Sequence, residues 1–454
     1  MIVLLPLFAA TSSKHPGLIS SLPMSLNDLP LELVNIIVDH FSDDVKALKT
    51  LALISRPFLS TCRTHLFTSL RLNTLHPSFS YKCVSWTKIL QRSSEILPYI
   101  RVLELGPPVF RLRARDPKLS SEHWNGVHNS GLPSIHDDRV QAIMKGAVNA
   151  QNVTLRFEFQ TWNRFSATFQ QCVLDLVRRD SISTLSLEDA VALPLHKLRT
   201  CRRLRNLSLI SISNPQEFHS DDDMEPDHNT RGHLESLTLY VSDECVEPLF
   251  GSPASPLDVS NLQRLAVNTT GSDGRKALEI IPSIAQSITI LELRVDDGKG
   301  YDLCSLDNFP ALSSLLISAT YDRHARSLLT LASFFSKTQN PSKLDQLQIL
   351  LRHDVPQLEH EKGSHDLMRL CAHNDWQTFD QSLLGRNMFP MLRVMKLVLR
   401  PKDVTTFINA HLISTLHLSL IKVMPRLYAL TNPTIEVFDG KCGVLSWQKR
   451  QLKF

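Results

Sequence analysis

A pattern of apolar positions, apolar-x-x-Leu-x-Leu, recurs along most of the chain. The last two positions of each copy are two residues apart, so both side chains face the same side of a strand. The first position lies three residues earlier, where the chain turns in. The copies are Phe67/Leu70/Leu72, Ile100/Leu103/Leu105, Ile182/Leu185/Leu187, Leu204/Leu207/Leu209, Leu234/Leu237/Leu239, Leu262/Leu265/Val267, Ile288/Leu291/Leu293, Leu312/Leu315/Ile317, Leu344/Leu347/Ile349, Val394/Leu397/Leu399 and Ile413/Leu416/Leu418, with Val153/Leu155/Phe157 as a weaker one.

Stretches with apolar residues at helical spacing lie between these copies. Residues 165–177 form one clear stripe, and residues 275–285, 323–335 and 368–384 are others. Strands that alternate with helices predict an α/β solenoid, whose units stack because none buries its own apolar face alone. The alternative is a doubly wound parallel sheet. The many strands of one type, and the lack of a Gly-rich phosphate turn after any of them, disfavour it.

Three short helices are predicted within residues 25–72. Pro30 and Pro57 suit the first turns of the first and third helices, with Asn27 and Asp28 as caps, and Ser42 to Asp44 separate the first two helices. About fifty residues cannot bury all the apolar side chains of this segment, so the surplus is expected to dock on another protein. The expected core is Leu33, Ile36, Ile37, Phe41, Val45, Leu48, Leu51, Ala52, Phe58, Cys62 and Leu66, and the expected surplus is Leu29, Leu31, Val34, Val38 and Leu53.

The same segment resembles the F-box, in the variant common in large families of fungal proteins. Pro57-Phe58 departs from the family, which often has a basic residue and Trp there. The resemblance implies that the helices dock on the adaptor of an SCF-type ubiquitin ligase and through it on a cullin, while the rest of the chain holds an unknown target protein. The residues that carry it are Leu29-Pro30-x-Glu32-Leu33, Ile37, Phe41, Leu48, Leu51 and Leu53-Ile54-Ser55-Arg56. By this motif the adaptor-docking residues are Leu29, Pro30, Leu33, Ile37, Leu48 and Leu51.

The repeated copies resemble leucine-rich repeats, and an F-box followed by such repeats is a known arrangement. Many intervals between copies are roughly 22 to 32 residues, as in that family. The Asn or Cys that normally follows each strand is mostly absent, with Asn268 as the best candidate. Uneven intervals, with polar insertions at residues 106–134 and 213–232, predict an irregular solenoid over residues 73–454.

The first residues need a separate interpretation. Residues 2–10 are apolar like the middle of a signal peptide, but they lack a basic start and are too short to span a bilayer. We expect residues 1–24 to be a disordered tail or a mis-assigned start. We expect the protein to be cytoplasmic or nuclear, without a membrane partner, and a monomer within its complex. Two alternatives remain: a repeat scaffold that engages no ligase, and a secreted repeat protein.

Composition and charge add little chemistry. The 454 residues are 43% hydrophobic and 21% charged with a net charge of +4, as in ordinary globular proteins. Eight cysteines without a C-x-x-C pair are typical of reduced, packed thiols. No motif of an enzyme, cofactor site or metal site is present, so we expect neither catalysis nor a cofactor.

Three polar groups of residues have simple interpretations. The acidic run at residues 221–227 lacks the alternating ligands of a calcium loop and is expected to be a solvated loop. His136-Asp137-Asp138 could suggest a metal site or a proton relay, but Asp137 and Asp138 are expected to cap the helix that follows. A basic cluster has no aromatic platform beside it, so no nucleic-acid partner is expected for it. It suits a solvated turn or a rim patch for an acidic partner. That cluster is Lys197, Arg199, Arg202, Arg203 and Arg205.

Overall fold

The chain forms two compact units, residues 1–68 and 69–454. Residues 69–72, which the sequence also places in the first strand copy, belong to the second unit. The N-terminal caps expected at Asn27 and Asp28, and the whole of residues 1–24, lie outside the described residues. The computed structural model describes residues 29–72, 79–106, 138–213, 233–250, 257–268, 274–295, 305–321, 326–353, 374–384, 388–400, 410–431 and 434–437.

The first unit consists of three helices, α1 (Leu31–His40), α2 (Val45–Ile54) and α3 (Arg56–Phe67). The carbonyl of Pro30 accepts the N–H groups of Leu33 and Val34, so Pro30 is the cap that precedes α1 instead of lying within its first turn. The Asp44 carboxylate accepts the N–H groups of Lys46 and Ala47 at 3.0 Å and caps α2, as the sequence predicts. Pro57 lies in the first turn of α3, where its missing N–H leaves no bond unmade.

The core of this unit differs from the expected one on α1. Val34 and Val38 are fully buried, although the sequence placed them in the surplus. Leu33 and Ile36, expected in the core, are exposed, and so is Val45 of α2. Helix α1 is apolar around most of its circumference, so its sequence offers two possible buried stripes and packing on α3 selects one of them. The buried set is Val34, Val38, Leu48, Leu51, Phe58 and Cys62, with Leu29, Ile37, Phe41, Ala52 and Leu66 partly buried against it.

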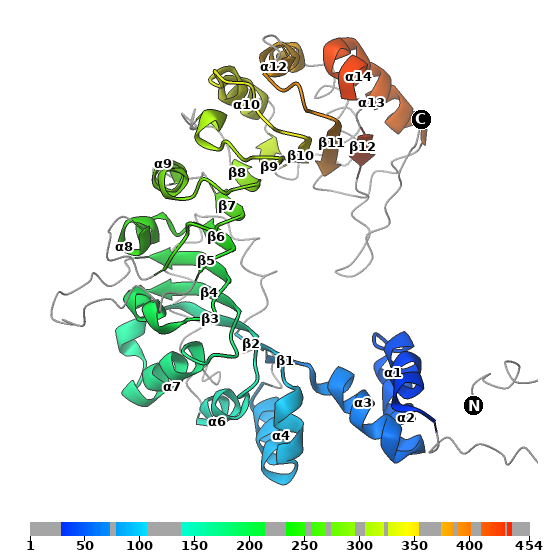
Figure 1. Cartoon of the computed structure of the whole chain (residues 1–454), viewed down its shortest axis with the longest axis vertical. Helices are drawn as coiled ribbons and strands as arrows, with labels where there is room; N and C mark the ends of the chain where they lie inside the picture. The colour runs from blue at the N-terminus through cyan, green and yellow to red at the C-terminus, as the bar shows by residue number, and fades with distance from the viewer. Residues whose placement is uncertain are drawn as a thin grey trace, which may run out of the picture. The chain divides into compact units, whose positions relative to one another are not determined.

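The second unit contains one 12-stranded sheet in which every strand pairs in parallel with the next one along the chain (Figure 1). A doubly wound sheet reverses its strand order at a switch point, so this consecutive order excludes that alternative. The result is an α/β, solenoid-like fold. The strands are β1 (Ser69–Leu72), β2 (Val102–Leu105), β3 (Asn152–Thr161), β4 (Thr184–Val191), β5 (Asn206–Ser213), β6 (Ser236–Tyr240), β7 (Arg264–Asn268), β8 (Ile290–Val295), β9 (Ser314–Tyr321), β10 (Gln346–His353), β11 (Val394–Arg400) and β12 (Thr434–Val437).

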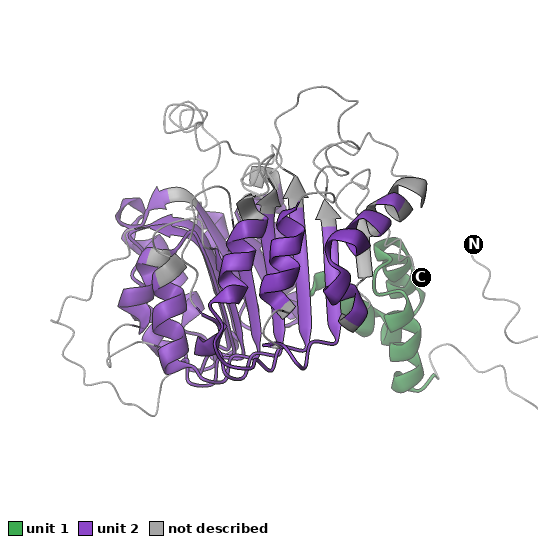
Figure 2. Ribbon diagram, turned by 90° about the horizontal axis from the view of Figure 1, so that it is seen from above, with its two compact units in different colours: residues 1–68 green, residues 69–454 purple. Residues whose placement is uncertain are grey.

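The leucines of the repeated pattern stack in continuous buried rows. Leu185 is in register with Leu207, Leu207 with Leu237, and Leu237 with Leu265. These four side chains are at most 2% exposed. The described helices lie along the face of the sheet that these leucines cover (Figures 1 and 2). They are α4 (Phe79–Arg92), α6 (Asp138–Gly146), α7 (Ala167–Val177), α8 (Val246–Phe250), α9 (Gly274–Ile284), α10 (Arg326–Ser336), α12 (Asp375–Leu384), α13 (Ala410–Val423) and α14 (Pro425–Thr431).

The strand predicted at Ile413/Leu416/Leu418 is wrong, because these residues belong to α13. Most residues from Ala410 to Val423 are apolar, and such a run fits a buried strand and a buried helix equally well. The weaker copy at Val153/Leu155/Phe157, by contrast, is a full strand, β3. Helices α7, α9 and α10 match predicted stripes, and α12 matches the described part of a fourth.

One backbone carbonyl per turn links consecutive strands where they begin. Ser183 O accepts the N–H groups of Arg205 and Asn206 at 2.9 and 3.0 Å, and Arg205 O accepts those of Glu235 and Ser236 in the same way. The same pattern recurs between neighbouring turns from β2 to β11. This ladder satisfies the backbone groups that a turn would otherwise leave unpaired.

A buried serine follows strand β6. Asn268 is the last residue of β7 and lies buried within the sheet. Ser242, three residues after the last leucine of β6, is 1% exposed. Its Oγ accepts the N–H of Ile212 at 2.9 Å and donates to Tyr240 O at 3.0 Å. Ser242 therefore closes the turn after β6.

Candidate docking surface of the helical unit

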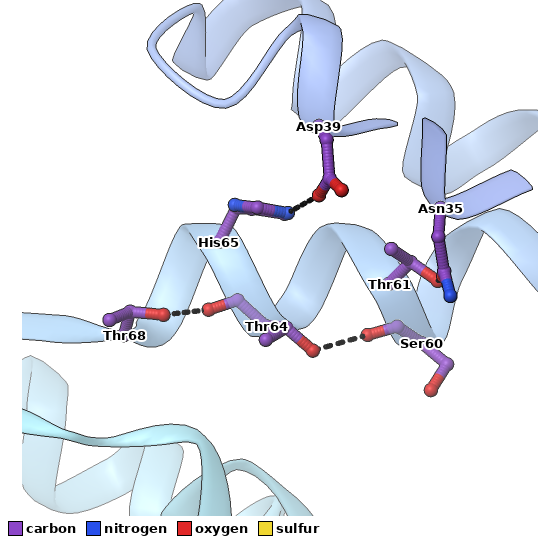
Figure 3. A network of polar contacts seen from close by, with 7 residues as sticks. All are labelled: Asn35, Asp39, Ser60, Thr61, Thr64, His65 and Thr68. Carbon is purple, nitrogen blue, oxygen red and sulfur yellow. Dashed lines mark hydrogen bonds and ion pairs between the residues drawn. The ribbon is translucent and has the colours of Figure 1, made fainter. Parts of the chain in front are cut away.

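Two polar contacts fix the rotation of α1 on α3 (Figure 3). The hydroxyl of Thr61 donates to Asn35 Oδ1 at 3.0 Å, and His65 Nε2 lies 2.9 Å from Asp39 Oδ1. Asn35 and Asp39 are one turn apart, so both contacts hold the same side of α1 against α3. This side adjoins Val34 and Val38 on the helix, which explains why these two valines are buried.

The opposite side of α1 carries an exposed apolar stripe, Leu33, Ile36 and Ile37. These positions have the i, i+3, i+4 spacing of neighbours on one helical face. Leu33 is 45% exposed and Ile36 is 64% exposed, while Ile37 is half-buried against the core. Pro30 is exposed directly before α1. The side of α1 that faces away from α3 is thus apolar and open to a partner.

Helix α2 adds further exposed apolar side chains. Leu53 is 89% exposed, as expected of a surplus residue, and Val45 and Ile54 are also exposed. Six of the 14 large hydrophobic residues that are exposed among the described residues lie between Leu31 and Ile54. Exposed apolar side chains on one helical face, such as Leu33 and Ile36 of α1, mark interaction sites, whereas isolated ones are normal.

The structure separates the six predicted docking residues into two groups. Pro30 and Leu33 are exposed, and Leu29 and Ile37 are half-buried. The other two, Leu48 and Leu51, are at most 7% exposed, because their face of α2 packs on α3. The motif marks both groups without distinguishing them, since a small domain uses leucine both for its core and for its contacts. Ile36, like Leu33 and Val45, is an exposed residue that the sequence wrongly assigned to the core.

The cysteine of this unit has no reactive character. Cys62 is completely buried in the core between the helices. Burial raises the pKa of its thiol, because the charged thiolate is disfavoured away from water. Cys62 therefore acts as a small apolar side chain. The other cysteines of the described residues, Cys83, Cys172, Cys201 and Cys245, are likewise buried thiols outside any disulfide.

The second unit presents a polar surface on the face of the sheet opposite the helices. Residues between the buried leucines project there, and Thr154, Ser186, Ser208 and Thr238 form a row of small hydroxyl side chains in register. Next to this row the Glu292 carboxylate accepts from Tyr240 at 2.8 Å and pairs with Arg264 at 3.0 Å. Tyr and Arg held in this way are frequent at protein interfaces.

Neither a group of metal ligands nor a membrane-spanning helix is found among the described residues. Among them, no three or more His, Cys, Asp or Glu side chains are grouped to hold a metal ion. None of the described helices is both long and apolar enough to cross a membrane. Asp138, one of the predicted caps, lies in the first turn of α6, whereas His136 and Asp137 lie outside the described residues. No protein-family model and no curated protein matches this sequence.

Proposed function

We propose that this chain is a substrate receptor of an SCF-type cullin ubiquitin ligase. The three-helix unit is an F-box that docks on the adaptor. The second unit is an irregular leucine-rich-repeat solenoid that binds a target protein on the polar face of its sheet. The receptor performs no chemistry itself and needs no cofactor.

The observation that carries the proposal is the exposed apolar stripe of α1. Its residues Leu33 and Ile37, together with Leu29 and Pro30, belong to the motif that resembles the F-box, and none of the four is fully buried. We assign them to the contact with the adaptor, with Ile36 added. Leu48 and Leu51 have a supporting role, because they hold α2 on α3 and so keep the unit folded.

The proposal is tested by binding purified chain to purified adaptor. Leu29→Ala with Pro30→Ala, and separately Leu33→Asp, should reduce the adaptor retained by about tenfold or more, since apolar anchors at an interface often contribute 2 kcal/mol or more. Val148→Asp is the matched control, because Val148 is similarly exposed, at 52%, but lies in the second unit. Circular dichroism checks that every variant remains folded.

Two results would contradict the proposal. If the double variant binds the adaptor as well as the parent does, Leu29 and Pro30 do not contact the adaptor. Purification of the full chain from cells without any cullin would favour a repeat scaffold that engages no ligase.

A further inference from the structure

A rim depression of about 670 Å3 lies where strands β4, β5 and β6 begin. Gln151, Ser183 and Arg205, whose backbone groups form the ladder between consecutive turns, contribute to its wall. The turn before β5 adds Arg202 and Arg203, and the residue His233 closes it near β6. The depression therefore spans several turns of the solenoid that are far apart in sequence and rigidly joined.

The lining is predominantly basic. It contains three arginines and one carboxylate, that of Asp180. Arg205 pairs with Glu235, and His233 Nδ1 lies 2.7 Å from Asp258 Oδ2. Arg202 and Arg203 are exposed, and within the described part of the chain no carboxylate forms an ion pair with either. Two guanidinium groups thus remain available to an anion.

The turn that carries these two arginines is held at both ends. Cys201 and Leu204 are buried in the core of the second unit. Cys201 N donates to Leu198 O at 2.9 Å, and Leu204 N donates to Cys201 O at 3.2 Å. A fixed backbone lowers the entropy lost when a partner binds.

The chemistry of the lining selects among anions. Its described lining residues include no Phe, Tyr or Trp, so they offer no stacking platform of the kind that single-stranded nucleic acids use. Guanidinium groups match carboxylates with two parallel hydrogen bonds. We propose that this rim depression binds an acidic peptide segment of another protein, with Arg202 and Arg203 as the carboxylate contacts. The inference does not depend on adaptor docking by the first unit.

The test measures the fluorescence anisotropy of labelled hexaglutamate with the full chain at about 0.15 M ionic strength, where the Debye length is about 8 Å. Arg202→Gln with Arg203→Gln should weaken binding by at least about fivefold, since each exposed ion pair contributes modestly. Arg164→Gln with Lys343→Gln removes the same charge at exposed positions outside the depression. This control should stay within about twofold of the parent, because screening weakens attraction between distant charges.

Four results would overturn the proposal. Equal weakening in both double variants would show attraction to net charge alone. Absence of binding both to the parent and to a chain with Asp221, Asp222 and Asp223 changed to Asn would show that the depression holds no acidic peptide. If the parent fails but a chain with Asp221, Asp222 and Asp223 changed to Asn binds, the chain's own acidic run is the occupant. Displacement of the peptide by a thymidine hexanucleotide at a lower concentration than by unlabelled hexaglutamate would make the ligand a nucleic acid.

Discussion

At the scale of single residues, Gly106 holds a position that no larger residue fits. It follows β2 with a φ of +120°, and its N–H donates to Leu72 O at 3.0 Å. A Cβ added there would lie 2.8 Å from Arg156 O and would overlap the Cβ of the same arginine. Arg156 is itself fixed, because its Nε lies 2.7 Å from Glu188 Oε2 in a buried ion pair.

We therefore expect Gly106→Ala to lower the free energy of unfolding by about 2 kcal/mol or more, from backbone strain and overpacking. Gly146→Ala is the matched control. A Cβ at Gly146 meets only the methyl groups of Leu97 and Leu90, which can move. Urea unfolding compares the two variants, and equal stability of both would show that the space beside Arg156 is not restrictive.

The thiol of Cys201 gives a second prediction at this scale. Burial raises its pKa to about 12, so almost no reactive thiolate exists at pH 8. Iodoacetamide should leave Cys201 unmodified in the native chain and label it after denaturation. Peptide mapping by mass spectrometry reads the result, and rapid labelling of the native chain would contradict the buried position.

At the scale of elements, helix ends are satisfied by residues far away in the sequence. The Arg179 guanidinium donates to the carbonyls of Met144, Lys145 and Ala147 at 3.0, 3.2 and 2.8 Å, at the end of α6. A cation at this end also interacts favourably with the helix dipole. At the N-terminal end of α14, the Asp380 carboxylate accepts the N–H of Leu427 at 2.9 Å.

Arg179→Ala should lower the free energy of unfolding by about 1–2 kcal/mol, because three carbonyls at the end of α6 lose a charged donor. The adjacent residue Arg178 is exposed and supplies the control, Arg178→Ala, for which we expect less than about 0.5 kcal/mol. Thermal unfolding monitored by circular dichroism compares the two. Similar losses of stability in both variants would show that Arg179 does not stabilise the end of α6.

Asp307 gives a pH-dependent prediction for the connection after α10. Burial by itself raises the pKa of this carboxyl. The N–H groups of Gln339 and Asn340, at 2.9 Å each, and the hydroxyl of Ser305 outweigh it and hold the pKa below its usual value. The ionised form is thus favoured in the folded state, and its stabilisation is present at neutral pH and lost as the pH falls through the lowered pKa.

We expect Asp307→Asn to be less stable than the parent at pH 7, with a difference that shrinks below the ordinary carboxyl pKa of about 4. Asp180→Asn, at an exposed position, is the control and should stay within about 0.5 kcal/mol of the parent. Urea titrations at several pH values measure both. A stability difference that grows as the pH falls would show that the pKa of Asp307 is raised in the folded state and not lowered.

At the scale of the whole molecule, each turn of the second unit contacts mainly its neighbours in the stack. Ile317 of β9 and Ile349 of β10 are in register on adjacent strands and fully buried. Ile212 is also buried but lies on β5, which is separated from β9 by three strands. In such a stack, the stability is approximately a sum of terms for single turns and for neighbouring pairs.

Effects of distant core changes should therefore add. Ile212→Val combined with Ile349→Val should equal the sum of the single effects within about 0.3 kcal/mol, whereas Ile317→Val with Ile349→Val should deviate by about 0.5 kcal/mol or more. Each single change costs about 0.5–1.5 kcal/mol, which leaves the chain folded. Coupling of the distant pair as strong as that of the adjacent pair would contradict the linear stack.

The sequence by itself determined strands β1 to β11 and their stacking order in the second unit. Two leucines spaced by one residue require an extended backbone, and the same spacing in turn after turn places them in one row. It also determined the cap at Asp44 and the surplus of apolar side chains in the first unit.

Only the tertiary structure decided which apolar face of α1 is buried, since both stripes suit a helix and the contacts of Asn35 and Asp39 with α3 select one. It also made a helix of the predicted strand in α13, and gave Arg179 and Ser242 their partners more than 25 residues away. Hydrophobic periodicity encodes the local path of the backbone, whereas burial and long-range hydrogen bonds depend on what packs beside it.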